Sequence, residues 1–381
     1  MINVRDYGAA GDGTTDDRQA IQDALDVGGH VYVPPGVYAV TSGVLRIQRR
    51  TRLTADPAAT ILRAGPTEGL LTNAEPGGPG GYSGHGSILI EGGTWDVNGA
   101  CEPGYACGIT VAHAEDVTVR DLTILNVPGW HAVEINSSRS VLVDNCRFKG
   151  FRHDGDRNFS EAIQVDAAIG ESTGVAPFDG TVCDGVEVRS CRFGGGGADG
   201  TEPWPRGIGT HTAPTTWHRN IKIVGNTFDA ASWCAIRTYW WDRCLITGNQ
   251  IIGATGDGIV VDYNSRYTLV HGNQVVDSGR NGILVAHGCT QVDVRDNTVI
   301  GSGQAANNTY GGVRVAGSSY VRVTGNTIRR RAAGNDARYG LWIEASAAGI
   351  QRYGNDCRYG GYSATLGDFS SGAVTAATDA I

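Results

Sequence analysis

Carboxyl groups and a histidine recur at matching places in a short repeated motif, and acid–base chemistry is built from such groups. Glu134, Asp166, His211 and Asp262 each occupy a non-aliphatic place in one motif copy, and Glu161 stands just before the copy that contains Asp166. Two carboxyl groups that face a sugar can hydrolyse a glycosidic bond, and a histidine exchanges protons near neutral pH. We expect Asp166 to be the main catalytic carboxylate with Glu161 as its partner and Glu134 and Asp262 as rivals.

Residues suited to holding a sugar chain lie in the same stretch of sequence. Arg237 offers a positive charge, Tyr239 a phenolic hydroxyl, and Trp240 and Trp241 flat aromatic faces on which sugar rings can pack. The further predicted substrate-contacting residues lie in or beside these motif copies: Gln164, His153, Asp154, Arg206 and Asp257. The competing interpretation is that the tryptophans pack within loops and that Glu161 and Asp257 are turn residues that bond their own backbone.

The motif consists of a small residue, an aliphatic residue, any residue, a second aliphatic or small residue, and any residue. Its copies begin at Gly108, Ala132, Ala162, Gly207, Ala235, Gly258, Gly282, Gly312 and Gly340. Neighbouring copies at 235, 258 and 282 are 23 and 24 residues apart. Alternation with a period of two indicates strands whose aliphatic residues point inward. This repeat length without helical periodicity predicts one turn of a parallel β-helix.

We therefore predict an all-β solenoid, a parallel β-helix of about ten coils that forms a single domain over residues 1–381. We expect an N-terminal cap over about residues 1–40 and a C-terminal tail over about residues 360–381. Residues 16–26 place Ala20, Ile21, Ala24 and Leu25 on one helical face. A helix there would cover the open first coil, which would otherwise expose strand edges.

A second strand follows each motif copy, and a fixed position lies five residues after its first member. That position is Leu122, Cys146 and Cys191 in the early copies. In later copies it is always asparagine: Asn226, Asn249, Asn273, Asn297, Asn326 and Asn355. Stacked asparagine side chains can hydrogen-bond from coil to coil and satisfy turn backbone groups. The sequence therefore predicts an asparagine ladder.

The aligned motif copies give two outward columns, with successive coils stacked roughly 4.8 Å apart. The first column is Thr110, Glu134, Gln164, Gly209, Arg237, Val260, Leu284, Arg314 and Trp342. The second is Ala112, Asn136, Asp166, His211, Tyr239, Asp262, Ala286, Ala316 and Glu344. Titratable residues gather in the middle coils, which predicts a functional groove there. We expect Asp166 to lie beside His211, and Glu134 to lie roughly 8 Å from Asp166.

Composition narrows the classes of function. The formal net charge is −8 and Lys and Arg do not cluster, which disfavours a nucleic-acid partner. The sequence lacks an apolar stretch of 18 residues, so we expect no membrane-spanning segment. The nine cysteines contain no C-x-x-C pair, and we expect most of them to be buried. No cage of oxygen ligands stands out, although Asp154 and Asp156 could contribute to one, so we expect neither a metal nor a cofactor.

The beginning of the chain resembles that of proteins of the pectate-lyase superfamily. The resemblance rests on residues 4–9 (VRDYGA), 11–17 (GDGTTDD), 31–38 (VYVPPGVY) and 91–96 (EGGTWD). That superfamily includes polygalacturonase-like hydrolases, alginate epimerases and phage tailspike depolymerases, so the resemblance implies a right-handed β-helix and a carbohydrate substrate. The Asn-Thr-Asp, Asp-Asp and Gly-His-Gly signatures of polygalacturonase-like enzymes are not reproduced, and only Arg237 resembles their substrate-clamping arginine, which argues against a galacturonate substrate.

The leading functional prediction is a glycoside hydrolase that cleaves a polysaccharide in the groove with Asp and Glu as acid and base. One alternative is a polysaccharide lyase or C5-epimerase acting on uronate polymers, for which His211, Tyr239 and Arg237 are suitable residue types. Another is a non-catalytic, glycan-binding tail spike, and a homotrimer is then an open possibility. The last is an intracellular enzyme acting on a small molecule. No signal peptide precedes Asn3, yet the resemblance favours a secreted or virion-associated protein.

Overall fold

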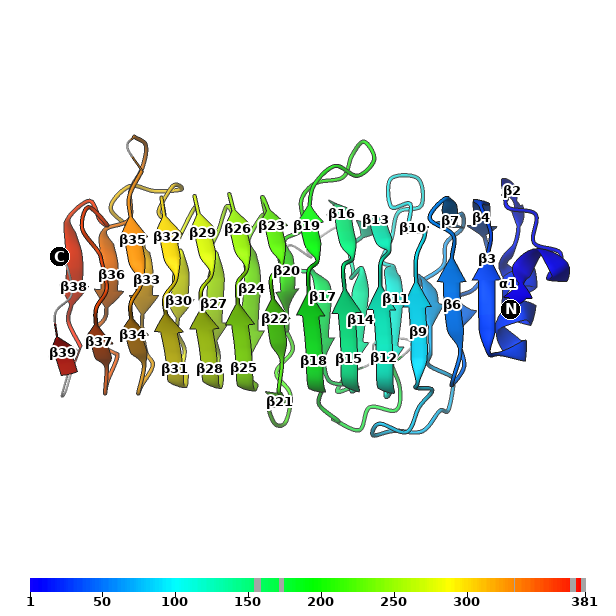
Figure 1. Cartoon of the computed structure of the whole chain (residues 1–381), viewed down its shortest axis with the longest axis horizontal. Helices are drawn as coiled ribbons and strands as arrows, with labels where there is room; N and C mark the ends of the chain where they lie inside the picture. Colours follow the sequence, from blue (N-terminus) through cyan, green and yellow to red (C-terminus); the bar gives the residue numbers. More distant parts are fainter. Residues whose placement is uncertain (154–158, 171–174, 332, 371–374, 378–381) are drawn as a thin grey trace. The chain divides into compact units, whose positions relative to one another are not determined.

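Alternating aliphatic residues form short strands throughout the computed structural model, which describes residues 1–153, 159–170, 175–331, 333–370 and 375–377. The chain divides into unit 1, Met1–Trp204, and unit 2, Pro205–Ile381. In each unit the chain passes through three parallel sheets in turn (Figure 1). None of the helices in the described part of the chain is long and apolar enough to span a membrane.

Unit 1 builds its sheets from strands that pair only with strands of the preceding and following turn. Its first sheet contains β1 (Ile2–Asn3), β3 (His30–Val33), β6 (Arg52–Ala55), β9 (Ile88–Glu91), β12 (Glu115–Arg120), β15 (Arg139–Asp144) and β18 (Asp184–Arg189). Its second sheet contains β2 (Asp12–Asp16), β4 (Gly36–Val40), β7 (Ala59–Arg63), β10 (Thr94–Asp96), β13 (Thr123–Pro128), β16 (Arg147–Arg152) and β19 (Arg192–Gly194). Its third sheet contains β5 (Leu45–Arg46), β8 (Gly69–Thr72), β11 (Cys107–Ala112), β14 (Val133–Asn136) and β17 (Glu161–Asp166).

Unit 2 repeats this arrangement. Its first sheet contains β21 (His218–Arg219), β22 (Lys222–Val224), β25 (Trp241–Thr247), β28 (Arg266–His271), β31 (Thr290–Arg295), β34 (Arg322–Thr324), β37 (Gln351–Tyr353) and β39 (Thr375–Ala377). Its second sheet contains β23 (Thr227–Asp229), β26 (Gln250–Ile252), β29 (Gln274–Val276), β32 (Thr298–Ile300) and β35 (Thr327–Arg329). Its third sheet contains β20 (Arg206–Gly209), β24 (Cys234–Tyr239), β27 (Ile259–Asp262), β30 (Ile283–Val285), β33 (Gly311–Val315), β36 (Tyr339–Ile343) and β38 (Ala364–Asp368).

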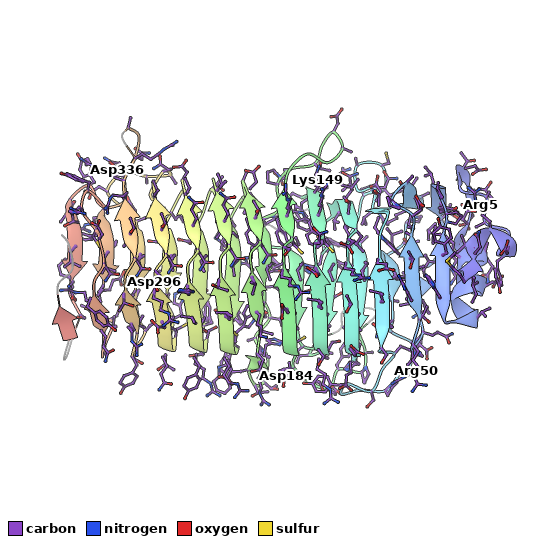
Figure 2. All side chains as sticks on the ribbon, in the orientation of Figure 1. Arg5, Arg50, Lys149, Asp184, Asp296 and Asp336 are labelled. Carbon is purple, nitrogen blue, oxygen red and sulfur yellow. The ribbon has the colours of Figure 1, made fainter. Side chains whose placement is uncertain are left out.

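The period-two pattern places the aliphatic side chains inside the turns. In β12, Val117 and Val119 are buried while Thr118 between them is partly exposed. Val117 pairs with Val141, so identical side chains stack from turn to turn. Polar side chains project outward, such as Asp184 in unit 1 and Asp296 in unit 2 (Figure 2). This alternation confirms the predicted parallel β-helix.

The predicted N-terminal helix is present as α1 (Arg18–Val27), preceded by a short 3-10 helix η1 (Val4–Tyr7). Ile21, Ala24 and Leu25 of α1 are buried, and α1 packs against η1 and β5. The helix therefore covers the first turns of unit 1, as its apolar face predicted.

The number of turns is about 14, and the prediction of about ten was too low. The sequence motif counts only turns with a small residue at the place of Gly108. In β8 the residue in register with Gly108 is Leu70, and β5, with the sequence LR, begins at Leu45, which pairs with Leu71, so neither strand matches the motif. The extension of one domain over the whole chain stays a prediction.

The predicted asparagine ladder runs through unit 2. The side-chain amide of each member donates to Oδ1 of the next, at 2.9 Å from Asn249 to Asn273 and 3.0 Å from Asn273 to Asn297. The same amide of Asn273 also donates to the backbone carbonyl of Ile246 at 2.9 Å. Because these groups are buried, each bond satisfies an atom that water does not reach.

We predict that Asn273→Ala destabilises the protein strongly. The change removes the acceptor for the Asn249 amide and the donor to Asn297 and Ile246, and each buried polar group left unpaired costs about 1–3 kcal/mol. Urea unfolding should therefore show a loss of about 3 kcal/mol or more. The control is Asn335→Ala, whose exposed amide bonds the Gln304 carbonyl and which should cost below about 1 kcal/mol. Equal effects of the two changes would contradict the ladder.

We also predict that one thiol reacts in the folded protein. All nine cysteines are free, and Cys101 is exposed while the others are buried. Burial raises the pKa of Cys183 and Cys289 to about 12, which keeps them as unreactive thiols at neutral pH. A thiol-specific reagent should label one group per chain before unfolding and all nine after it. If Cys101→Ser still reacts rapidly with the reagent, one of the cysteines described as buried must be accessible, which would contradict the prediction.

Candidate functional site

The strand register confirms the two predicted outward columns of the third sheet within each unit. In unit 1, Glu134 pairs with Gln164 and Asn136 with Asp166. In unit 2, Arg237 pairs with Val260, and Tyr239 with Asp262. The motif alignment therefore predicted the register correctly, and polar residues from successive turns are direct neighbours on this face.

The carboxyl groups of unit 1 form a buried polar network. Glu134 accepts hydrogen bonds from Thr110 Oγ1 at 3.4 Å and Asn136 Nδ2 at 3.3 Å. Asp166 accepts from Gln164 Nε2 at 2.7 Å and from the Ala167 backbone N–H at 2.8 Å. Side-chain amides thus hold the carboxylates on two neighbouring turns of this face.

Glu134 opens onto a cavity of about 230 Å³ in unit 1. Arg46, Glu68, Thr110 and Trp130 also line it, and the Trp130 ring stacks on Tyr105 with 5.8 Å between ring centroids. The cavity offers two carboxyl groups, a guanidinium and an aromatic face. The motif columns did not indicate these residues, because Arg46 and Glu68 lie in turns whose strands do not match the motif and Trp130 precedes the copy that begins at Ala132.

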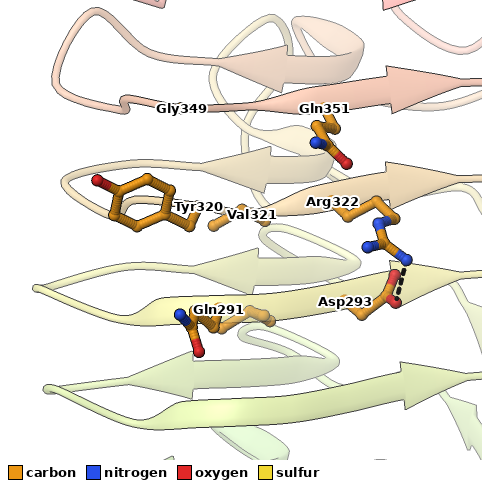
Figure 3. Close-up of a pocket in the computed structure, with 8 residues that line it drawn as sticks. Gln291, Asp293, Tyr320, Val321, Arg322, Gly349 and Gln351 are labelled. Carbon is orange, nitrogen blue, oxygen red and sulfur yellow. Dashed lines mark hydrogen bonds and ion pairs between the residues drawn. The ribbon is translucent and has the colours of Figure 1, made fainter. Parts of the chain in front are cut away.

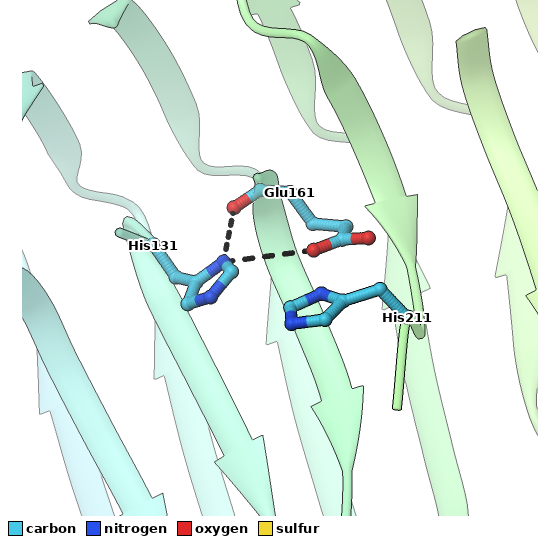
Figure 4. Close-up of side chains that lie close together, drawn as sticks. All are labelled: His131, Glu161 and His211. Atoms are coloured by element: carbon cyan, nitrogen blue, oxygen red, sulfur yellow. Dashed lines mark hydrogen bonds and ion pairs between the residues drawn. The ribbon is translucent and has the colours of Figure 1, made fainter. Parts of the chain in front are cut away.

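Glu161 lies inside the molecule and cannot touch a bound polymer in this conformation, which corrects its predicted role. Its carboxyl Oε2 is 3.8 Å from His131 Nδ1, and its backbone oxygen is 2.8 Å from the same nitrogen (Figure 4). Since a carbonyl oxygen only accepts, Nδ1 of His131 carries a proton. His211 belongs to unit 2, so its predicted pairing with Asp166 stays a prediction.

A titratable cluster with one exposed member lies on this face in unit 2, around Asp262. The Asp262 carboxylate receives Arg237 Nε at 3.0 Å on one oxygen and His287 Nδ1 at 2.6 Å on the other. Asp262 is nearly buried, whereas the His287 side chain is 60% exposed. The carboxylate therefore orients an imidazole whose other face reaches solvent.

Aromatic rings surround this pair. The Tyr239 and Tyr263 rings lie 4.7 Å apart between centroids, and the Tyr263 ring stacks on His287 at 4.8 Å. The Arg237 guanidinium lies 4.8 Å from the centre of the Tyr239 ring. Burial raises the pKa of the Tyr239 phenol, and the charge of Arg237 partly opposes that rise. Tyr239 therefore stays protonated at neutral pH and can donate a hydrogen bond.

Tyr263 and His287 were not predicted from the sequence. Each directly follows a residue of the second column, after Asp262 and Ala286, and each has a positive φ, 38° and 51° respectively. This turn carries the side chains beside the columns instead of away from them. The signal that could have found them is an aromatic residue immediately after the motif in successive copies, which Trp240 shares.

The predicted tryptophan platform needs a correction. Trp241 is the first residue of β25, a strand of the first sheet, and its ring faces the core. It is therefore fully buried, and its indole N–H donates to Thr210 Oγ1 at 2.9 Å. Trp240 is partly exposed and packs on Trp217 with 5.1 Å between ring centroids. The Arg266 guanidinium carbon lies 3.8 Å from the centre of the Trp217 ring. Trp240 thus stays a candidate contact, and Trp241 does not.

Two predicted substrate contacts, Arg206 and Asp257, have buried side chains, and their roles stay predictions. Arg206 is buried and stacks at 4.1 Å on the Trp233 ring. Asp257 is buried and accepts from the Asn281 backbone and side-chain nitrogens at 2.9 and 2.6 Å. Burial raises its pKa, which these bonds oppose. The position before the strand closes the turn beneath the sheet, so its side chains bond backbone and neighbouring turns.

The remaining predicted contacts lie on or beside the segment between β16 and β17. His153 is exposed. Asp154 lies outside the described residues, as does Asp156. Their roles as substrate contacts therefore stay predictions.

The described turns, with their stacked columns and three parallel sheets, define a parallel β-helix. Residues 107–328 match the family described as right handed beta helix region, and residues 1–84 match the family described as rhamnogalacturonase A/epimerase, pectate lyase-like. The chain belongs to the right-handed parallel β-helix family, within the pectate-lyase-like superfamily.

Two relatives and one solved structure illustrate this membership. Plasmin and fibronectin-binding protein A of Streptococcus pneumoniae is 32% identical over 281 residues, which cover 65% of this chain and 39% of that protein. Mannuronan C5-epimerase AlgE5 of Azotobacter vinelandii is 32% identical over 136 residues, 34% of this chain and 12% of the epimerase. The crystal structure of PfbA, a surface adhesin of S. pneumoniae, superposes with a TM-score of 0.77 at 24% identity and covers 96% of this chain and 91% of that one.

Proposed function

We propose that the protein binds a uronate-containing polysaccharide on the outward third sheet of unit 2 and alters it by proton transfer at Asp262 and His287. The observation that carries the proposal is the 2.6 Å contact from His287 Nδ1 to a nearly buried carboxylate, with the imidazole itself open to solvent. A base oriented by a third group is the arrangement that general acid–base catalysis uses.

The groups around this pair suit an acidic sugar. Sugar rings pack on aromatic faces, and the stacked rings of Tyr239, Tyr263 and His287 supply such faces on successive turns. A guanidinium has five N–H donors, and Asp262 and the Thr210 carbonyl engage two of them among the described residues. The other donors of Arg237 can bind a substrate carboxylate.

The chemistry follows from those roles. A base at the site removes the proton at C5 of a uronate, and the positive charge of Arg237 stabilises the charge that builds on the substrate carboxylate. If the C4–O bond then breaks and the leaving oxygen takes a proton, a C4=C5 double bond forms and the reaction is a lyase reaction. If a proton returns to C5 from the opposite face, the sugar is epimerised. The likeness to a mannuronan C5-epimerase supports this class.

We predict that His287→Gln lowers turnover by ~10²–10⁴-fold, because it removes the proton-transfer group. The assay offers polymannuronate, polyguluronate and polygalacturonate, and follows ultraviolet absorbance of unsaturated ends and deuterium uptake at C5 in heavy water. His271→Gln is the matched control, since His271 also faces an aspartate, Asp296, at 3.4 Å but lies on the first sheet. Full activity of His287→Gln on a turned-over polymer would place the chemistry elsewhere.

Hydrolysis is the second candidate, and the cavity at Glu134 favours it. Glu134 and Glu68 line the same cavity, and paired carboxyl groups are the catalysts of most glycosidases. The predicted pair of Glu134 and Asp166 remains part of this candidate.

If hydrolysis is the activity, Glu134→Gln should abolish release of reducing ends without any unsaturated product, with a loss of ~10²-fold or more. Glu115→Gln, an exposed residue of β12 that pairs with Arg139, is the control and should leave activity unchanged. Reducing-end release that persists in Glu134→Gln eliminates this candidate.

A polymer that binds and is recovered unchanged would identify a glycan-binding module without catalysis. The likeness to plasmin and fibronectin-binding protein A of S. pneumoniae supports that outcome, and a place outside the cell or on a virion belongs to the same proposal. A glycan as the partner of the whole protein, and its assembly as a homotrimer, are part of this proposal.

A further inference from the structure

Two tyrosine rings stand exposed on the first sheet of unit 2, away from the third-sheet residues described above. Tyr267 is 52% and Tyr320 68% exposed. The residues that flank them pair in register, so Tyr267, Gln291 and Tyr320 occupy one column on successive turns. Two steps of the stack separate the tyrosines by roughly 9.6 Å, which is close to the length of one disaccharide in an extended chain.

The stability of the fold does not account for these tyrosines. Tyr267, Gln291 and Tyr320 have φ values of 49°, 54° and 53°, a left-handed conformation that is unfavourable for residues with a Cβ. Gly349 fills the next place in the column with φ 63°, so glycine fits this position. A ring that remains largely in water gains little from burial, and the Tyr267 ring contacts the Arg266 guanidinium at 5.7 Å from its centre.

A cavity of about 360 Å³ lies beside Tyr320, between β31, β34 and β37 (Figure 3). Its polar lining includes Gln291, Asp293, Arg322 and Gln351. Asp293 Oδ2 lies 3.3 Å from Arg322 Nη1, so the pair carries no net charge. Asp293 Oδ1 is shielded from solvent and accepts no hydrogen bond within the part of the chain that the structure describes.

Gly349 makes room for the Tyr320 ring at this cavity. A Cβ at that position would lie 3.1 Å from Tyr320 Cδ1, which is tighter than ordinary contact between side chains. The ring can therefore lie against the next turn and present its outer face beside the polar lining. An aromatic face next to two side-chain amides is a combination that suits a sugar ring and its hydroxyl groups.

We propose that Tyr267, Tyr320 and this cavity form a second binding site, for an extended neutral oligosaccharide. The two rings pack on sugar faces one disaccharide apart. Gln291 and Gln351 bond hydroxyl groups. Because Arg322 is paired with Asp293, the cavity beside Tyr320 offers no net charge from this pair with which to select an acidic polymer, in contrast to the cluster at Asp262. The inference stands independently of the proposed third-sheet chemistry.

The test is calorimetric titration of the whole chain with cellohexaose, laminarihexaose, maltohexaose and mannohexaose, and with hexagalacturonate for comparison. We expect at least one neutral hexamer to bind, and Tyr320→Asn and Tyr267→Asn each to weaken it about tenfold. Thermal unfolding of both variants should be unchanged or shifted upward, since asparagine tolerates the left-handed conformation better than tyrosine. A merely structural tyrosine would instead lower the unfolding temperature when replaced.

The matched control is Tyr353→Asn, an exposed tyrosine of β37 outside the column and the cavity lining, which should bind as the parent protein does. The inference is overturned if none of the neutral hexamers binds, or if both tyrosine variants keep full affinity. It is also overturned if hexagalacturonate binds at these tyrosines more tightly than every neutral hexamer. Loss of neutral-sugar binding in His287→Gln but not in Tyr320→Asn would assign that binding to the third sheet and equally defeat it.

Discussion

Parallel hydrogen bonding between successive turns, held in one register, is the constraint on which the rest of this structure depends. Val117 over Val141 in unit 1 and Ile236 under Ile259 in unit 2 are products of that register. A slip by one residue would move every aliphatic side chain from the core to the surface. The asparagine ladder adds side-chain bonds at a fixed turn and so resists such a slip in unit 2. Once the register is fixed, it also determines which outward residues of successive turns lie next to one another.

Function on such a scaffold therefore arises from what each turn adds to a column. Asp262 lies nearly out of water between a guanidinium and an imidazole, and a carboxylate in that position is stabilised by its two partners at the cost of its own hydration. The exposed His287 is the member of the trio that a polymer can reach. In unit 1 the carboxylates of Glu134 and Asp166 instead accept hydrogen bonds from side-chain amides and a hydroxyl, which orient them. The two clusters are thus suited to different chemistry.

The sequence predicted those parts of the structure that follow from a period of two. The columns containing Glu134, Asp166, Tyr239 and Asp262 were placed correctly within each unit because alternation alone decides which side of a strand a residue faces. Prediction failed where the chain enters a strand. Glu161 is the first residue of β17 and its side chain is buried, and Trp241 is the first residue of β25 and has its ring in the core. Tyr263 and His287 were missed because each follows its strand with a positive φ, which places its side chain beside the columns. A period of two does not describe that conformation.

The central claim is that a uronate polymer binds over Tyr263 with its reacting carbon at His287. The most direct measurement is a crystal structure of the His287→Gln variant soaked with a mannuronate hexamer, in which the substitution slows turnover. The account predicts a sugar ring packed on Tyr263, its carboxylate in contact with the Arg237 guanidinium, and its C5 facing position 287. A hexamer bound on another face, or lying across this face with its carboxylates directed away from Arg237, would contradict it.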